Sequence, residues 1–107
     1  MLKKETAVKY LNEGESLELV LVGEIDHHTA IELRKESDAI INRVKPKKVA
    51  LNLEGIGFMD SSGLGFIIGR MALVNKLGGE LVLKKPNKSV KKICRLAGLE
   101  RMVKTEN

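Results

Sequence analysis

Three small polar residues, Asp60-Ser61-Ser62, stand between an apolar segment and a long helical pattern. Asp and Ser are preferred at helix N-caps because their side-chain oxygens accept from the free N–H groups of the first turn. The pattern predicts that both serines lie at the positively polarised start of a helix, exposed on a strand-to-helix turn. Gly63 and Gly65 are expected to leave the backbone there uncovered. A hydroxyl in this position could act as a nucleophile, bind a phosphate or accept one.

Serine hydrolase chemistry fits the sequence poorly. It requires a base beside the serine, usually a histidine, and the chain has two histidines, His27 and His28. Neighbouring residues on a helix point in different directions, so at most one of them could face Ser61. The G-x-S-x-G elbow is also absent, because Asp60 stands two residues before Ser62. These observations argue against a serine hydrolase.

Metal and nucleotide chemistry is also poorly supported. The adjacent histidines lack further ligands at zinc spacing, and the chain has no G-x-x-x-x-G-K-[ST] loop. A receiver in which Asp60 accepts a phosphate would need a carboxylate cluster for Mg²⁺, and the first two predicted strands end in Asn12 and Gly23-Glu24. We predict neither a metal site nor a cofactor.

The composition fits a single globular domain over residues 1–107, because 43% of the residues are apolar and 31% are charged. Residues 1–5 precede no apolar stretch, so no signal peptide is expected. The densest apolar run, residues 19–22, is too short to cross a bilayer. We therefore expect a cytoplasmic protein. The single Cys94 excludes an internal disulfide, and its place in a helical apolar series predicts a buried thiol.

A basic segment lies near the carboxyl end of the chain, with eight basic residues and one acid, Glu100, between Lys84 and Lys104. On a helix, four of the cations share the face opposite Cys94: Lys88, Lys91, Lys92 and Arg95. A solvated outer face explains them most simply. No aromatic residues interleave with these charges to stack on bases, so we expect no specific nucleic-acid binding. An acidic protein surface is the better candidate partner for this face.

The hydrophobic patterns alternate between strand and helix periods after an opening hairpin. We predict strands at 6–11, 17–22, 49–54, 80–84 and 102–104. Helices are predicted from an N-cap at Asp26 or Thr29 to Val44, at 61–77 and at 87–97. This order predicts an α/β domain with a mixed sheet of about five strands packed with helices. The nearly continuous apolar run at 17–22 predicts a central strand covered on both faces, and residues 55–57 are expected to form a loop.

Two turns are expected to meet at the carboxyl ends of the parallel strands, where α/β proteins gather ligands and partners. These are residues 23–28, with Asp26 or Thr29 available as an N-cap, and residues 57–63. Their meeting would place Asp26 and Asp60 near Ser61. We take this edge of the sheet as the functional one.

The helix predicted at 61–77 is apolar on two sides. One side is expected to be core and carries Leu64, Ile67, Ile68, Met71 and Val74. The other carries Phe66, Leu73 and Leu77, with Gly69 and Arg70 close by. Because full burial of such a helix is difficult in a small domain, we interpret the second side as a partner surface, with packing under a neighbouring helix as the alternative. Phe66 and Leu73 would be its apolar anchors, with Arg70 at the rim.

These motifs also carry a family resemblance. Asp60-Ser61-Ser62-Gly63-Leu64-Gly65, preceded by Leu51-Asn52-Leu53 and Phe58-Met59, resembles the signature of STAS-domain anti-sigma factor antagonists. Gly23-Glu24-Ile25-Asp26-His27-His28-Thr29-Ala30 is similar to an early loop of the sporulation anti-sigma-F factor antagonists. Gly78-Gly79-Glu80-Leu81 and Ala97-Gly98-Leu99 extend the similarity over essentially the whole chain.

The resemblance implies a STAS fold and a partner-switching function, so we predict that the chain is not an enzyme and has no catalytic residues. The unphosphorylated antagonist would bind an anti-sigma factor that is also an ATP-dependent serine kinase, and so free a sigma factor. The kinase would phosphorylate the first serine of the motif, here Ser61, and a separate serine phosphatase would reverse this. The alternative is a non-switching STAS scaffold or transporter-accessory module. We expect the partner to contact Asp26, Asp60, Ser61, Ser62, Gly63, Phe66, Arg70 and Leu73.

Overall fold

The computed structural model describes residues 7–106. Its elements follow one another as β1 (Ala7–Glu13), β2 (Ser16–Ile25), α1 (Thr29–Val44), β3 (Lys48–Met59), α2 (Ser61–Lys76), β4 (Glu80–Lys84), α3 (Lys88–Leu96), the 3₁₀ turn η1 (Leu99–Arg101) and β5 (Lys104–Glu106).

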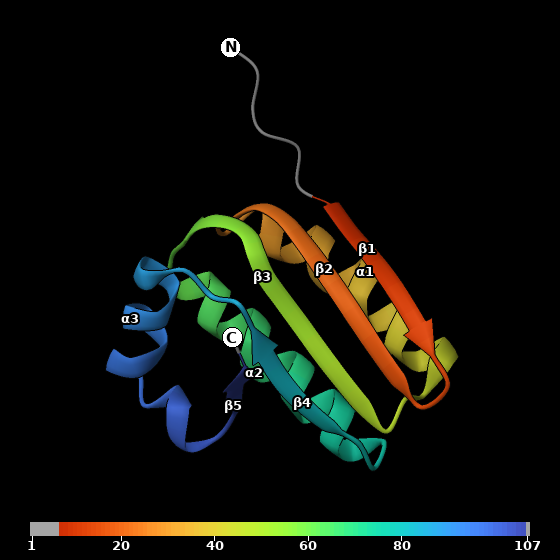
Figure 1. Ribbon diagram of the computed structural model, residues 1–107. Coiled ribbons are helices and arrows are strands. Elements are labelled where there is room, and N and C mark those ends of the chain that lie inside the picture. Colours follow the sequence, from red (N-terminus) through yellow and green to blue (C-terminus); the bar gives the residue numbers. More distant parts are fainter. Residues whose placement is uncertain (1–6, 107) are drawn as a thin grey trace.

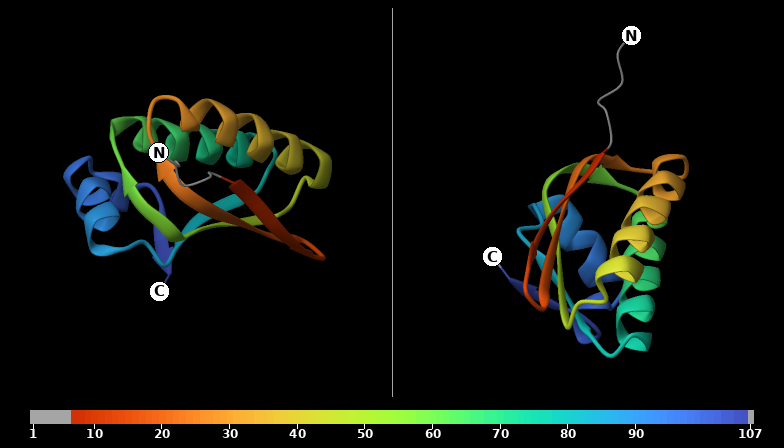
Figure 2. Two further views of the ribbon diagram at one scale, coloured as in Figure 1. Left: turned by 90° about the horizontal axis from the view of Figure 1, so that it is seen from above. Right: turned by 90° about the vertical axis from the view of Figure 1, so that its right-hand side faces the viewer.

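The strands form one sheet in the order β1-β2-β3-β4-β5 (Figure 1). β1 is antiparallel to β2, and the other neighbouring strands are parallel. α1 and α2 lie side by side over one face of the sheet, whereas α3 packs beyond one end of it (Figure 2). The predicted fold class, an α/β domain with a five-stranded mixed sheet and an opening hairpin, is confirmed.

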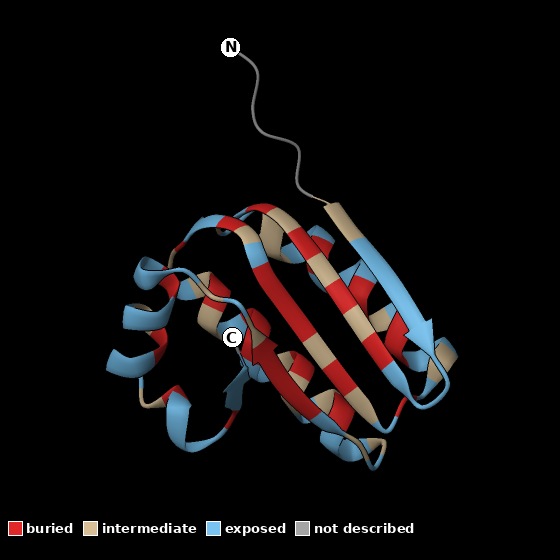
Figure 3. Cartoon of the chain, in the orientation of Figure 1, coloured by how far each residue is buried: buried red, intermediate tan, exposed pale blue. Residues whose placement is uncertain are grey.

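The core lies between the sheet and the helices, and burial alternates along β2 (Figure 3). Leu17, Leu19 and Leu21 are at most 1% exposed. Val20 and Val22 point to the other face and are half-buried. The prediction that this strand is covered on both faces is wrong. The apolar run is continuous because β-branched valines also fit a half-buried sheet face.

Several element boundaries differ from the prediction. The first strand was predicted from Thr6, which lies outside the described residues, and β1 continues to Glu13 before a turn in which Gly14 has φ 61°. The last strand starts at Lys104 instead of Met102, because η1 occupies the preceding residues.

The predicted loop at 55–57 is part of β3, which runs on to Met59. The register between β2 and β3 shifts twice along this stretch, so the strand continues through irregular pairing. A Cβ on Gly55 would lie 2.8 Å from the backbone oxygen of Leu21. Gly55 therefore permits close approach of the two strands and does not mark a break between elements.

Candidate functional site

The turns after β2 and β3 meet at one edge of the sheet. Ile25 pairs with Met59 in the last step of the β2–β3 register. The backbone N–H of Asp60 donates to the carbonyl oxygen of Ile25 across 3.1 Å. The predicted meeting of the turns around Asp26 and Asp60 is therefore confirmed, and both turns lead directly into helices.

Asp60 is the N-cap of α2, as predicted. Its backbone is extended, and its Oδ1 accepts from the N–H of Ser62 at 2.7 Å. Its carbonyl oxygen accepts from the N–H of Gly63 at 2.9 Å. Ser61 is the first residue of α2 and is exposed, while Ser62 is half-buried. The geometry presents the Ser61 hydroxyl to solvent at the positive end of the helix dipole.

Asp26 organises the neighbouring turn in the same way. Its Oδ1 accepts from the N–H groups of His28 at 2.8 Å and Thr29 at 2.9 Å. The Thr29 hydroxyl donates to the Glu24 carbonyl at 2.7 Å, which fixes the other side of the turn. The N–H of Thr29, followed by that of His28, lowers the pKa of the Asp26 carboxyl. Asp26 is therefore ionised at neutral pH, and both turns carry a carboxylate.

Gly63 is buried, contrary to the expectation that it leaves backbone uncovered. A Cβ at this position would lie 2.6 Å from Sδ and 2.8 Å from Cβ of Met59. Glycine is required here so that the first turn of α2 can pack on the end of β3. The expectation is correct for Gly65, where a Cβ would meet nothing within 4 Å.

Phe66 and Arg70 are also buried, so their predicted placement on an exposed outer face is wrong. They are 4% and 5% exposed. Nε of Arg70 lies 2.7 Å from Oδ1 of Asp38 on α1, and its guanidinium lies over the Phe66 ring. Leu73 is half-buried and packs against the core. The alternative, packing under a neighbouring helix, is correct for this side, because α1 lies beside α2 and widens its buried side beyond the part that faces the sheet.

Because the buried side of α2 faces α1 as well as the sheet, Ile68, which was predicted as core, lies at the surface. It is 41% exposed. It shares the exposed face of α2 with Ser61, Gly65 and Ala72. Between Ser61 and Asn75 the helix contains one charged residue, the buried Arg70. The solvent face of α2 is therefore uncharged over most of its length.

The sequence analysis did not identify two large apolar side chains as exposed. Ile31 on α1 is 46% exposed, and Phe58, which precedes the Asp60 turn, is 47% exposed. Ile31 could have been found because it is a large apolar residue that lies off the buried side of α1, which carries Leu33, Ile40 and Ile41.

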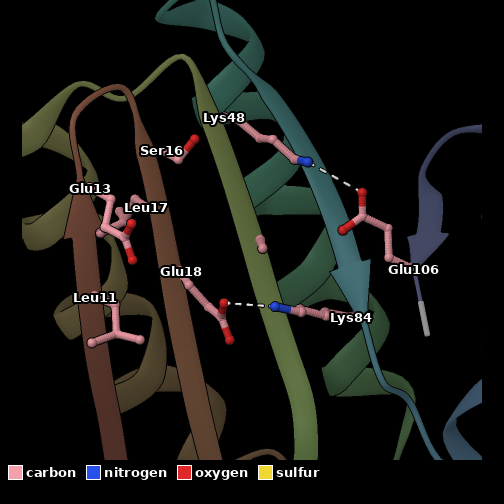
Figure 4. Close-up of a pocket in the computed structure, with 9 residues that line it drawn as sticks. Leu11, Glu13, Ser16, Leu17, Glu18, Lys48, Lys84 and Glu106 are labelled. Atoms are coloured by element: carbon pink, nitrogen blue, oxygen red, sulfur yellow. Dashed lines mark hydrogen bonds and ion pairs between the residues drawn. The ribbon is translucent and has the colours of Figure 1, made fainter.

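A hollow of about 290 Å³ lies on the sheet face turned away from α1 and α2 (Figure 4). Four of its five charged side chains pair with one another, and Glu13 forms no ion pair within residues 7–106. Nζ of Lys84 lies 2.9 Å from Oε1 of Glu18, and Nζ of Lys48 lies 3.2 Å from Oε2 of Glu106. Hydrogen bonds from Asn52 and then Lys84 lower the pKa of Glu18. Because these charges satisfy one another, this hollow is a weaker candidate site than the Asp60 edge.

We searched residues 7–106 for clusters of metal-ligating side chains and for membrane-spanning helices. Within residues 7–106, no three metal-ligating side chains gather at a point. No helix in this range is long and apolar enough to cross a membrane. Cys94 is 5% exposed, as predicted, and burial raises the pKa of its thiol.

The chain is similar to known regulators over most of its length. The family model of the STAS domain matches residues 8–107. An anti-sigma F factor antagonist from Paenibacillus polymyxa is 42% identical over 79 residues, which make up 74% of this chain and 68% of the relative.

Two solved structures of the anti-sigma factor antagonist SpoIIAA share the fold. The unphosphorylated form is 27% identical, with a TM-score of 0.79 over 96% of this chain and 89% of that one. The phosphorylated form, from Bacillus, is 29% identical, with a TM-score of 0.70 over 94% and 92%.

The sequence motifs, the fold and these similarities agree with one another. Anti-sigma factor antagonists are regulators without enzymatic activity, so the prediction of a non-enzyme is confirmed. The resemblance to the sporulation anti-sigma-F factor antagonists is confirmed as well. The chain belongs to the family of STAS-domain anti-sigma factor antagonists.

Proposed function

We propose that the unphosphorylated chain binds an anti-sigma factor and thereby releases a sigma factor in the cytoplasm. The anti-sigma factor is also an ATP-dependent serine kinase that phosphorylates Ser61. Phosphorylation ends the binding, and a serine phosphatase restores it. The names of the relatives support the anti-sigma partner.

The exposed position of Ser61 at the start of α2 carries the phosphorylation part of this proposal. Ser61 follows the capping Asp60 directly, and the residue is exposed. Ser62 is half-buried, and its N–H is already bonded to Asp60. The first serine is therefore the more accessible acceptor. SpoIIAA, a relative of the same fold, is known in a phosphorylated form.

A phosphate on Ser61 would affect the fold only slightly. It adds about −1.5 to −2 charge at pH 7. The start of α2 attracts this charge by about 0.3–2 kcal/mol. The Asp60 carboxylate, and the Asp26 carboxylate on the neighbouring turn, oppose that attraction. Because the contributions have opposite signs, the free energy of unfolding should change little.

Inside a complex the phosphate would have a larger effect. A charge left uncompensated at an interface costs about 2–5 kcal/mol. This corresponds to a loss of affinity of roughly thirty- to several-thousand-fold. The proposed contact edge consists of Asp26, Asp60, Ser61 and Ser62. Gly63, Phe66 and Arg70 are buried, so they would affect binding only by supporting the fold of this edge. Contact between Leu73 and the partner stays a prediction.

Phosphopeptide mapping tests the assignment. The chain, Ser61→Ala and Ser62→Ala are each incubated with ATP and the anti-sigma factor kinase from the same genome. We expect labelling of the chain and of Ser62→Ala, and none of Ser61→Ala. Labelling that persists in Ser61→Ala and disappears in Ser62→Ala would contradict the assignment.

Calorimetry and binding titrations test the switch. Phosphorylated chain should melt within a few degrees of the unphosphorylated chain and yet fail to displace sigma. Ser61→Ala should bind regardless of kinase activity and serves as the control. Equal affinity of the two forms would favour the alternative, a non-switching STAS scaffold or transporter-accessory module.

A further inference from the structure

A hollow of about 210 Å³ lies between α1 and α2 on the outer surface. Ile31 and Arg34 line it from α1, and Gly65 and Gly69 line it from α2. Phe66, which is buried, lines its inner wall. The hollow begins one helical turn after Ser61, since Gly65 follows Ser61 by four residues on the same side of α2. It therefore continues the proposed contact edge.

The free protein gives no reason for glycine at positions 65 and 69. A Cβ at either position would meet nothing within 4 Å. Neither residue is among those with positive φ. Glycine inside a helix is destabilising relative to alanine. Gly63 is different, since its Cβ would collide with Met59. A partner that approaches α2 from outside would explain the bare backbone at 65 and 69.

The hollow also carries an uncompensated positive charge. Burial lowers the pKa of the Arg70 guanidinium, the Asp38 carboxylate raises it, and the nearby charge of Arg34 lowers it further. Arg70 pairs with Asp38 at 2.7 Å. Arg34 forms no ion pair with any residue in the range 7–106. The Asp38 carboxylate therefore pairs with Arg70 alone, and no carboxylate within residues 7–106 pairs with Arg34.

We propose that a helix of the anti-sigma factor packs along α2 across Gly65 and Gly69 and places a carboxylate on Arg34. This inference rests on the proposed function. Helix axes approach to distances set by the side chains at the crossing, and two glycines one turn apart allow the closest approach. An apolar side chain of the partner helix fills the hollow beside Ile31, and the missing acid comes from the partner.

The glycines allow a test in which stability and affinity move in opposite directions. Gly65→Ala, Gly69→Ala and the double variant are compared with the parent chain by thermal melting and by titration with the anti-sigma factor kinase from the same genome. Each alanine should raise the melting temperature by roughly 2–6 °C. The double variant should bind the kinase about tenfold or more weakly, because the added methyl groups hold the partner away.

Asn75→Ala is the matched control, since Asn75 is exposed on the same helix and does not line the hollow. It should raise the melting temperature without changing affinity. Arg34→Gln should weaken binding and reduce its dependence on salt. Lys35→Gln, its exposed neighbour on α1, should do so far less.

The outcomes separate this inference from the function on which it rests. If the parent chain does not bind the kinase, the proposed function fails. If it binds and the glycine variants bind equally well, this inference alone is wrong. A fall in melting temperature would show that the fold needs the glycines, which overturns the inference. Sedimentation tests a different occupant. If the parent chain is a dimer, and the glycine variants lose the dimer but keep their affinity for the kinase, the occupant is a second copy of the chain and the inference is overturned.

Discussion

The outer faces of helices α2 and α3 differ in charge. The outer face of α3 carries four cations: Lys88, Lys91, Lys92 and Arg95. The outer face of α2 carries no charge from Ser61 to Asn75 and contains two glycines. Both helices bury apolar side chains underneath, so the contrast is confined to the surface.

Exposure to solvent explains the charged outer face of α3 but not the uncharged outer face of α2. Charged residues opposite a buried stripe are the ordinary pattern of a surface helix. A face without charge that includes helix-interior glycines loses about 0.5–1 kcal/mol per glycine relative to alanine. Such a loss of stability is understandable if the face is covered in a complex. The predictions below test this difference, beginning with the largest expected effect.

Phe66→Ala should destabilise the free chain by about 3–5 kcal/mol, because it removes a buried aromatic ring between α1 and α2. The measurement is urea unfolding of the variant and parent. Ile68→Ala, on the exposed face of the same helix, is the control and should cost much less. If Phe66→Ala unfolds like the parent but loses partner affinity, the ring belongs to a contact surface after all.

Gly63→Ala should destabilise the chain by about 1–3 kcal/mol, because the new Cβ would lie 2.8 Å from Cβ of Met59, which cannot move without the backbone. Gly65→Ala should stabilise it. The two variants are chemically identical and lie two residues apart, so melting curves recorded side by side are a matched comparison. Equal shifts of the same sign would remove the distinction between a packing glycine and a surface glycine.

The features that the sequence predicted correctly depend on local chemistry. Asp60 caps α2 because its carboxylate reaches the N–H of Ser62 two residues later, which spacing alone can show. The element order follows from the hydrophobic period of each segment. The meeting of the Asp26 and Asp60 turns follows from parallel strand order.

The errors depend on contacts between distant residues. Phe66 and Ile68 are equally apolar, and only the position of α1 decides which one is buried. Gly55 looked like a loop residue because its contact with Leu21 is 34 residues away in the chain. Gly63 resembled Gly65 in sequence, yet only one of them lies against Met59. No local pattern contains this information.

The smallest effect is expected on α3. Replacing Lys88, Lys91, Lys92 and Arg95 with Gln should change the free energy of unfolding by less than about 1 kcal/mol. None of these cations forms an ion pair within residues 7–106. The like charges repel one another at i,i+3 and i,i+4 spacing, and their removal offsets any lost favourable interaction with the helix end. Thermal melting at low and moderate salt measures this change.

The same variant tests whether the basic face reads nucleic acid. The parent chain should associate with DNA weakly at low salt and lose that association steeply as salt rises, because binding to phosphates releases counterions. The Gln variant should lose it altogether, while kinase affinity stays within a few-fold of the parent. A sequence-selective footprint of the parent near physiological salt, absent from the variant, would contradict the prediction. Such a footprint would show that the basic face of α3 binds DNA specifically and is more than a solvated helix face.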